Sequence, residues 1–270
     1  MQKKSAIDDL DVESIYIEFM AEAHKTGRWL VHTEDSVDST QNWVKGRLSV
    51  LPDFSAVIAS TQTSGRGRMD RGWVSPPGGL YASILLKPSP PPEFAPRVSL
   101  LIALILCELL EDAGLVPWVK WPNDVVVNER KVAGIIAECG NSPCSWFILG
   151  VGVNLSAVPD VPGRDHLPAG AWCSSRPAPS PHELLVEVLS ALDIYWSNRE
   201  SDPLSGRAEA ISGKLWNKGK KVKLSVGDET FSGIVTGISG AGSLILSTDS
   251  GERRFVSGEL LTVHGESMRK

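Results

Sequence analysis

The sequence predicts an α+β domain followed by a small antiparallel β-barrel. Between residues 31 and 215, short apolar strands alternate with segments of helical periodicity. From residue 222 onward the pattern changes to short strands separated by Gly-Asp and Ser-Gly turns, which is typical of a compact barrel of about fifty residues. A chain of 270 residues is long enough for one large domain and one such module.

The chain is expected to divide into three segments. Residues 7–23 carry apolar positions at helical spacing, with Asp8 or Asp9 as a cap, so residues 1–30 are expected to form an N-terminal helical segment. Residues 31–215 are expected to form the main domain, and residues 216–270 the C-terminal module.

Turn residues and apolar runs locate the expected elements. Asn128-Glu129-Arg130 has the chemistry of a hairpin turn between two strands. The main domain is predicted to contain strands from residue 31 and at residues 56–61, 80–86, 119–121, 125–127, 132–137 and 146–153. Helices are predicted at residues 38–43, 99–112, 182–199 and 205–215. The module is predicted to contain strands at residues 222–226, 231–238, 244–247 and 253–256.

Charge and hydropathy limit the classes of partner. The formal net charge is −5 and the isoelectric point is near 5.6, so the chain has no basic footprint for nucleic acid. The N-terminus lacks the apolar core of a signal peptide, and the strongest apolar run, residues 98–107, is too short to span a bilayer. We therefore expect a cytoplasmic protein that binds neither DNA nor a membrane.

Cysteine and histidine patterns predict no metal site built from protein ligands. The four cysteines contain no CxxC pair, and none of the five histidines pairs with an acidic residue at metal-ligand spacing. Cys107 lies inside an apolar helical run and is expected to pack in the core. Cys139 and Cys144 could pair, although a cytosolic chain of this size gives no reason to expect a disulfide.

A loop rich in glycine and arginine is the most informative segment. Residues 61–73 hold three glycines and three arginines directly after an apolar strand. Glycine lets backbone N–H groups approach a ligand closely, and arginine offers a fork of donors that fits phosphate or carboxylate oxygens. The loop matches neither the Walker A nor the Rossmann glycine pattern. It is suited to close over a polyanion, although the same residues could form a solvated basic turn.

A second constellation places a lysine beside a glycine on a strand. The segment Val-Lys-Trp-Pro-Asn-Asp at residues 119–124 is followed by Lys-Val-Ala-Gly-Ile-Ile-Ala-Glu at residues 131–138. Next to Gly134, the ammonium of Lys131 can approach a ligand with little steric hindrance. The plainer alternative is an exposed hairpin lysine.

Taken together and in order, these motifs resemble those of the biotin protein ligase family. The sequence contains Gly-Arg-Gly-Arg-x-x-Arg-x-Trp, Lys-Trp-Pro-Asn-Asp, Lys-x-x-Gly-Ile and Gly-x-Gly-x-Asn at compatible spacing. The resemblance runs from about Ser36 to the end of the chain. It implies the biotin/lipoate ligase catalytic fold, which is similar to class II synthetases: a seven-stranded mixed sheet flanked by helices, with an SH3-like C-terminal barrel. It also implies a short form without an N-terminal DNA-binding domain, because only about thirty residues precede the catalytic region.

The resemblance implies a two-step reaction. Biotin's carboxylate would attack the α-phosphorus of ATP to give biotinyl-AMP, and the acyl group would then pass to a lysine of a biotin carboxyl carrier domain of a carboxylase. ATP would be the co-substrate and Mg²⁺ the activator, with no permanently bound cofactor. Because one anion attacks another in the first step, the site must screen negative charge and stabilise it as it develops.

The same resemblance assigns residues to the biotin side of the site. Gln41 stands where the family usually has asparagine, a shorter amide with the same donors and acceptors. The residues expected to contact biotin are Ser39, Thr40, Gln41, Gln62, Gly65, Arg66, Gly67, Arg68, Lys131 and Gly134.

Catalytic and nucleotide-binding residues follow from the same motifs. Lys131 would bridge the biotin carboxylate and the α-phosphate, Arg68 would enclose both groups, and Asp124 would either position Mg²⁺ or orient the incoming lysine. The residues expected on the nucleotide side are Arg66, Arg68, Arg71, Trp73, Asn123, Lys131 and Asn154.

Several alternatives stay open. Trp73 could belong to the core, and Asn154 or Asp124 could simply cap local backbone. A lipoate ligase, a biotin-responsive DNA-binding repressor and a non-catalytic biotin-binding module are the competing functions. The oligomeric state is open between monomer and homodimer.

Overall fold

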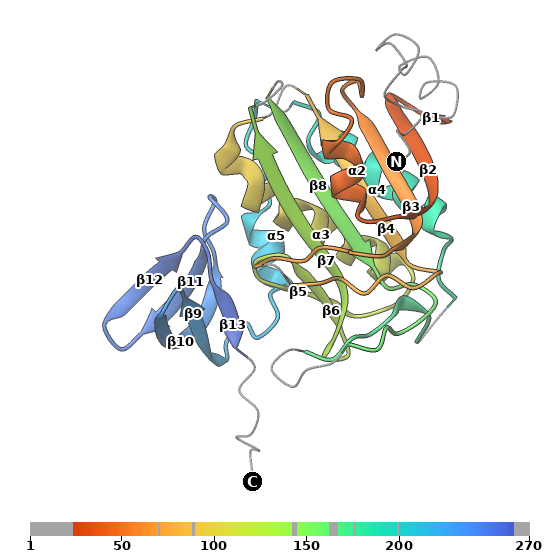
Figure 1. Cartoon of the computed structure of the whole chain (residues 1–270). Coiled ribbons are helices and arrows are strands. Elements are labelled where there is room, and N and C mark those ends of the chain that lie inside the picture. The colour runs from red at the N-terminus through yellow and green to blue at the C-terminus, as the bar shows by residue number, and fades with distance from the viewer. Residues whose placement is uncertain are drawn as a thin grey trace, which may run out of the picture.

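The computed structural model describes residues 24–69, 71–87, 90–141, 145–161, 167–174, 177–198 and 200–261. One mixed sheet, with strand order β1-β2-β3-β4-β8-β7-β6-β5, forms the main domain (Figure 1). Its strands are β1 (His24–Thr26), β2 (Trp29–Val37), β3 (Ser55–Gln62), β4 (Leu80–Leu86), β5 (Pro117–Lys120), β6 (Asp124–Val127), β7 (Arg130–Gly140) and β8 (Trp146–Val153).

The predicted seven-stranded mixed sheet is confirmed, with one short strand added at its edge. β2 and β3 run parallel, whereas every other neighbouring pair is antiparallel. The strands predicted at residues 80–86 and 146–153 have the bounds of β4 and β8. Asn128 and Glu129, at positive φ, form the turn of the predicted hairpin between β6 and β7.

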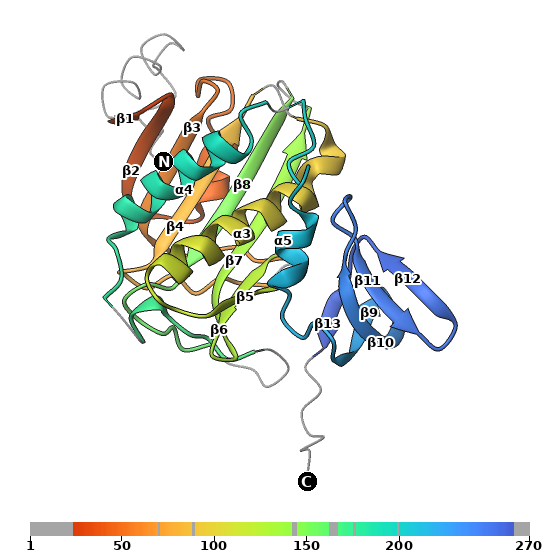
Figure 2. The same cartoon turned by 180° about the vertical axis from the view of Figure 1, so that it is seen from behind.

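Helices cover the two faces of the sheet unequally. The structure has α2 (Thr40–Lys45), α3 (Ala95–Asp112), α4 (Pro181–Tyr195), α5 (Ala208–Gly213) and the 3₁₀ turns η1 (Pro92–Phe94) and η2 (Trp172–Ser174). α3 and α4 lie across one face (Figure 2), and α2 lies on the other (Figure 1). α4 begins with a capping box between Ser180 and Glu183 and ends earlier than predicted, and α5 is also shorter than predicted.

Successive side chains of β4 and β8 point to opposite faces of the sheet and so enter different cores. In β4, Ile84 joins the large core under α3 and α4, whereas Leu85 joins the small core under α2. In β8, Phe147 and Leu149 face the large core, and Ile148 faces the small one. The face that carries α2 is therefore only partly covered by helix, which leaves room for a site.

The C-terminal module is a five-stranded antiparallel sheet beside the β5 and β6 end of the main sheet (Figures 1 and 2). Its strands are β9 (Lys221–Val226), β10 (Glu229–Ile238), β11 (Leu244–Thr248), β12 (Gly251–Phe255) and β13 (Glu259–Leu261). The predicted SH3-like barrel is confirmed, and β13, which pairs with β9, is a strand that sequence patterning missed.

The structure describes only the end of the predicted N-terminal segment, residues 24–30. Residues 1–23 lie outside the described residues. Residues 24–30, which we grouped with a helical segment, instead form β1 and the start of β2. They do so because Trp29 and Leu30 are buried in β2, which pairs with β1 on one side and with β3 on the other. Among the described helices, none is long and apolar enough to cross a membrane.

The core under α3 yields a stability prediction. Leu101 is 0% exposed on α3, so Leu101→Ala is expected to lower the free energy of unfolding by about 2–5 kcal/mol. Denaturant unfolding measures the change. The control is Val186→Ala on the outer side of α4, where 38% exposure predicts a change within about 0.5 kcal/mol. Equal losses in the two variants would contradict the assigned core.

Candidate active site

A cleft of about 180 Å³ opens on the sheet face that carries α2, between the glycine- and arginine-rich loop and strands β7 and β8. Every sequence-predicted site residue except Gly65 lines it. These residues are Ser39, Thr40, Gln41, Gln62, Arg66, Gly67, Arg68, Arg71, Trp73, Asn123, Asp124, Lys131, Gly134 and Asn154. Residues far apart in the sequence therefore meet at one cavity, since Ser39 and Leu260, which both line it, are 221 positions apart.

Three glycines make the floor of the cleft flat. Gly134, Gly150 and Gly152 alternate on the α2 face of β7 and β8, and all three line the cavity. A Cβ atom at Gly152 would lie 2.6 Å from Cε2 of Trp73, and one at Gly134 would lie 2.9 Å from Cζ3 of the same ring. The indole of Trp73 therefore lies against bare backbone, at the edge of the cleft and outside the core.

The arginine loop is a narrow hairpin and not an open coil. Arg66 pairs with Gly72 in an isolated bridge, the N–H of Gly67 donates to the Arg71 carbonyl at 2.6 Å, and the N–H of Trp73 donates to the Gly65 carbonyl at 2.8 Å. At Gly65 a Cβ atom would lie 2.3 Å from the Trp73 carbonyl oxygen. Gly65 is thus required for hairpin closure and lies beside the cleft, not in its lining.

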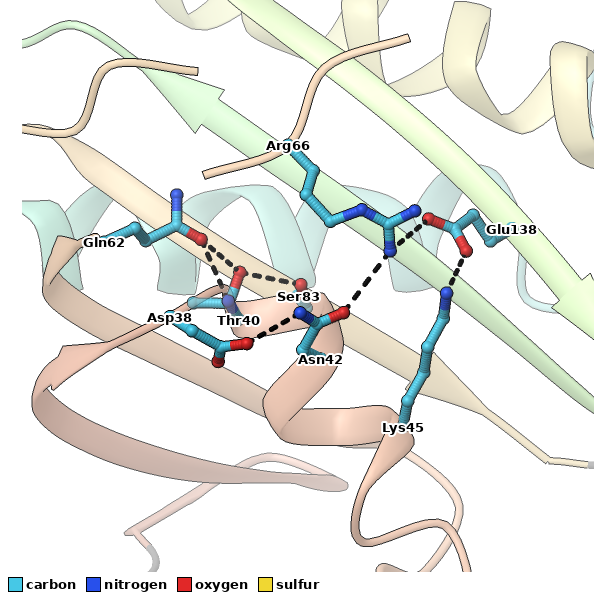
Figure 3. A network of polar contacts seen from close by, with 8 residues as sticks. All are labelled: Asp38, Thr40, Asn42, Lys45, Gln62, Arg66, Ser83 and Glu138. Carbon is cyan, nitrogen blue, oxygen red and sulfur yellow. Dashed lines mark hydrogen bonds and ion pairs between the residues drawn. The ribbon is translucent and has the colours of Figure 1, made fainter. Parts of the chain in front are cut away.

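One end of the cleft is lined by neutral polar groups. The Gln62 side-chain oxygen accepts from the Thr40 N–H at 2.9 Å, and the Thr40 hydroxyl in turn accepts from Ser83 (Figure 3). Gln41 is 2% exposed, and within the described part of the chain neither its amide oxygen nor its amide nitrogen has a hydrogen-bond partner. A buried amide without partners is costly, so this end is suited to a ligand that both donates and accepts.

A β-bulge turns Lys131 into the cleft. Val126 pairs with Lys131 and Val125 with Ala133, so Val132 is the extra residue in β7. Val132 and Ala133 both enter the large core, which leaves Lys131 on the same face as Gly134. Without the bulge, strict alternation would direct Lys131 toward α3.

Two lysines share one carboxylate at the centre of the cleft. Lys131 Nζ lies 2.8 Å from Asp124 Oδ1, and Lys120 Nζ lies 3.9 Å from Asp124 Oδ2. Burial lowers the pKa of Lys120, while the charge of Asp124 acts in the opposite direction. Lys131 also lies 5.2 Å from the centroid of the Trp73 ring, a cation–π contact. Asp124 therefore orients Lys131, and is itself largely engaged by cations.

Arg68 and Arg71, which belong to the arginine loop, each contact a different part of the chain. Arg68 Nη1 donates to the Asn123 side chain at 3.1 Å, and Asn123 donates onward to the Ile135 carbonyl at 2.8 Å. Burial lowers the pKa of Arg68, which Asp124 partly offsets. Arg71 forms an ion pair with Glu259 of β13 at 2.6 Å, so the C-terminal module closes one side of the cleft.

Asn154 and Trp172 fix the wall behind Lys131. Asn154 is 3% exposed and its amide nitrogen donates to the Gly170 carbonyl, while its oxygen has no partner within the described residues. Asn154 thus combines a structural contact with a free acceptor at the cleft. Trp172 belongs to the large core, where it is 3% exposed.

Among the cleft residues that the sequence motifs did not predict, four affect the charge or the shape of the cleft. Lys120 stands inside a quoted motif but carried no assigned role, and its burial beside Asp124 depends on the fold. Gly150 and Gly152 belong to the Gly-x-Gly-x-Asn motif, which is the sequence signal that identifies them beside Asn154. Glu259 lies in a strand with no pattern of its own, so no sequence signal points to it.

The described residues contain no group of three or more His, Cys, Asp or Glu side chains that could hold a metal ion. The geometry instead joins a flat pocket with unpaired amides to a cluster of four cations. A site of this kind suits a small carboxylic acid beside a polyphosphate, and together with the mixed sheet it defines an enzyme of the carboxylate-activating ligase class.

Comparisons with known proteins agree with this class. The model of the biotin/lipoate A/B protein ligase family matches residues 34–154, and that of the biotin protein ligase C-terminal domain matches residues 219–260. The chain is 30% identical to a biotin–[acetyl-CoA-carboxylase] ligase of Paracoccus denitrificans over 79% of its own length and 93% of that protein. It is also 30% identical to the bifunctional ligase/repressor BirA of Escherichia coli, over 83% and 71% of the two chains.

Solved structures give the same result. The biotin protein ligase of Aquifex aeolicus in complex with biotin and ATP is 29% identical, with a TM-score of 0.75 and coverage of 85% of this chain and 97% of that one. The Leishmania major enzyme, at 22% identity and a TM-score of 0.57, shares the fold. The chain belongs to the biotin protein ligase family.

The glycine floor yields a prediction. Gly152→Ala is expected to displace the Trp73 ring and shift its fluorotryptophan NMR resonance, assigned with Trp73→Phe, because the new methyl group would overlap the indole. Gly213→Ala is the control, since a Cβ atom there meets nothing within 4 Å. An unmoved Trp73 resonance in Gly152→Ala would contradict this packing.

Proposed function

We propose that this chain is an ATP-dependent biotin protein ligase that forms biotinyl-AMP and then transfers biotin to a lysine of a carboxylase carrier domain. The observation that carries the proposal is the continuity of one cleft, in which the partnerless amide of Gln41 and the Lys131–Asp124 pair line the same cavity. A bicyclic urea needs donors and acceptors at one end, and an adenylate needs cations at the other.

Biotin would lie along the glycine floor. Its ureido group would supply the partners that Gln41 lacks, next to the Gln62 and Thr40 network. Its carboxylate would then reach the cations near Lys131. The flat floor at Gly134 and Gly152 leaves space for rings and an acyl chain that side chains would otherwise fill.

In the first step a biotin carboxylate oxygen attacks the α-phosphorus of ATP, and the bond to pyrophosphate breaks. Lys131 would bridge the attacking carboxylate and the α-phosphate, because it is oriented by Asp124 and lines the cavity. Arg68 and Arg71 would neutralise charge that develops on the phosphates. Trp73, Asn123 and Asn154 would border the nucleotide, since they line the same cavity.

Mg²⁺ would act on the phosphates of ATP. The Asp124 carboxylate oxygens face Lys131 and Lys120, so its contacts favour orientation of Lys131 over coordination of a cation. Mg²⁺ typically keeps several waters and binds through substrate phosphates, which fits a site without a cluster of protein carboxylates among the described residues.

In the second step the amine of the carrier lysine attacks the acyl carbon, the bond to AMP breaks, and one proton leaves the amine. Holding the adenylate under the arginine hairpin would exclude water until the acceptor arrives. The proposed chemistry is compatible with either a monomer or a homodimer. With a net charge of −5, we infer no affinity for DNA.

The lysine at the centre gives a direct test. Biotin-dependent exchange between ATP and pyrophosphate is expected for the native chain, and Lys131→Ala should lower its rate by about 10²–10³ because one preorganised charge is lost. Lys223→Ala, an exposed lysine of β9, is the matched control and should exchange normally. Exchange with lipoate alone would assign the chain to a lipoate ligase, and tight biotin binding without exchange would assign it to a non-catalytic module.

Gln41 gives a test of the biotin end. Gln41→Leu is expected to raise the Kd for biotin about ten- to one-hundredfold in calorimetric titrations, because buried polar groups of the ligand would lose their partners. Gln41→Asn should retain most of the affinity, since asparagine has the same donors and acceptors. An unchanged Kd in Gln41→Leu would place the ureido group elsewhere.

A further inference from the structure

The Arg66 side chain lines the cleft and extends to Asn42 of α2 and Glu138 of β7 (Figure 3). Its Nη1 lies 3.2 Å from Glu138 Oε1 and 3.4 Å from the Asn42 side-chain oxygen. Arg68 and Arg71, in contrast, contact Asn123 and Glu259 on the opposite side of the hairpin. The three arginines of one loop therefore face two different environments.

The Asn42 amide is oriented by a residue one turn earlier. Its Nδ2 donates to Asp38 Oδ2 at 2.7 Å, and this hydrogen bond lowers the pKa of the Asp38 carboxyl. An ionised carboxylate only accepts, so the amide nitrogen must face Asp38 and the amide oxygen must face Arg66. Asp38 thus fixes the acceptor that Arg66 meets.

Glu138 holds a second cation besides Arg66. Lys45, the last residue of α2, pairs with Oε2 of Glu138, while Arg66 pairs with Oε1. Each carboxylate oxygen therefore has its own cation, and all three side chains are 25–39% exposed. Glu138 lies on β7 at the same face as Gly134, so the pair joins the hairpin to a rigid strand of the main sheet.

Charge balance separates Arg66 from the anion site. Arg66 and Lys45 are offset by Glu138 and Asp38 within one network (Figure 3). The central cluster instead has Lys120, Lys131, Arg68 and Arg71 against Asp124 and Glu259, which leaves an excess of two positive charges among these residues. An incoming polyanion is attracted by the second group and not by the first.

We propose that Arg66 fastens the arginine hairpin to α2 and β7, and that Glu138, supported by Lys45 and Asn42, is the positioning residue that holds it. The ion pairs join three elements that are separate in the sequence, so they keep the hairpin closed without occupying the anion site. This replaces the expectation that the Arg66 side chain binds biotin and nucleotide. The backbone at Arg66 and Gly67 still lies at the cleft.

The contact between Arg66 and Glu138 would affect how long the site retains biotinyl-AMP. Under the proposed function, a loosened hairpin would release biotinyl-AMP faster and expose it to water, whereas the central cations would still form it. Loss of Glu138 should therefore raise the rate of adenylate release while leaving the rate constant of adenylation close to native.

Hydrogen exchange on the ligand-free chain tests the fastening directly. The amides of Gly67 and Trp73 close the hairpin, and Glu138→Gln is expected to speed their exchange about two- to fivefold, the range typical of a partly exposed ion pair. Arg66→Met should speed exchange at least as much, because it removes the Asn42 contact as well as the Glu138 pair. The double variant Arg66→Met/Glu138→Gln should exchange no faster than Arg66→Met alone, because the ion pair is already lost in that single variant.

Glu252→Gln is the matched control. Glu252 forms an exposed ion pair with Arg254 on β12, so its loss removes a carboxylate of the same kind outside the cleft and should leave hairpin exchange unchanged. Unchanged exchange in Glu138→Gln, or additive effects in the double variant, would overturn the proposal. If Glu138 only stabilised the fold as a whole, Glu138→Gln would lower the free energy of global unfolding. Hydrogen exchange at core amides would then speed up as much as exchange in the hairpin.

A second readout separates this proposal from the proposed function. With biotin and MgATP, release of biotinyl-AMP from Glu138→Gln should be about two- to fivefold faster than from the native chain, with native affinity for ATP. If the native chain forms no adenylate, the proposed function fails. Hydrogen exchange alone then tests whether the Arg66–Glu138 pair holds the hairpin. Tighter ATP binding by Glu138→Gln, combined with weaker binding by Arg66→Met, would show that Arg66 is an anion-binding group and overturn the proposal.

Discussion

The two-residue alternation of β7 and β8 is the constraint on which the cleft depends. One face of these strands supplies the large core beneath α3 and α4, and the other must stay flat enough for a ligand. Gly134, Gly150 and Gly152 meet both demands, because a glycine contributes backbone to the sheet and no atom to the cavity. The bulge at Val132 then moves one lysine from the buried face to the ligand face at the cost of one extra residue.

Around this floor, neutral polar groups and cations occupy different ends of the cleft. Neutral amides and hydroxyls gather at the α2 end, where Gln41 lacks partners, and cations gather near Asp124. The separation matters because a neutral urea group needs hydrogen-bond donors and acceptors, whereas a phosphate needs positive charge. Asp124 keeps Lys131 and Lys120 near each other despite their like charge, so the field is prepared before any ligand enters.

Local patterns were sufficient to predict much of this arrangement. Apolar runs bounded by turn residues located the seven main strands, and the glycine- and arginine-rich motif located the loop beside the cleft. Long-range pairing was not predictable in the same way. Glu138 and Lys45 are 93 positions apart, and Arg71 and Glu259 are 188 apart, so their contacts arise only from sheet order and module placement. The short strand β13 could not be predicted from the sequence pattern, because three residues are too few to show an alternation of apolar and polar side chains.

The Arg71–Glu259 pair also has a consequence for how the site comes into being. A chain leaving the ribosome completes β2 through β8 long before Gly258, Glu259 and Leu260 are made, yet these three residues border the cleft. During synthesis the cation Arg71 is thus without the carboxylate that holds it, and the pocket has one open side. This side of the cleft closes only when β13 docks beside Arg71. The site is therefore completed late in synthesis of the chain.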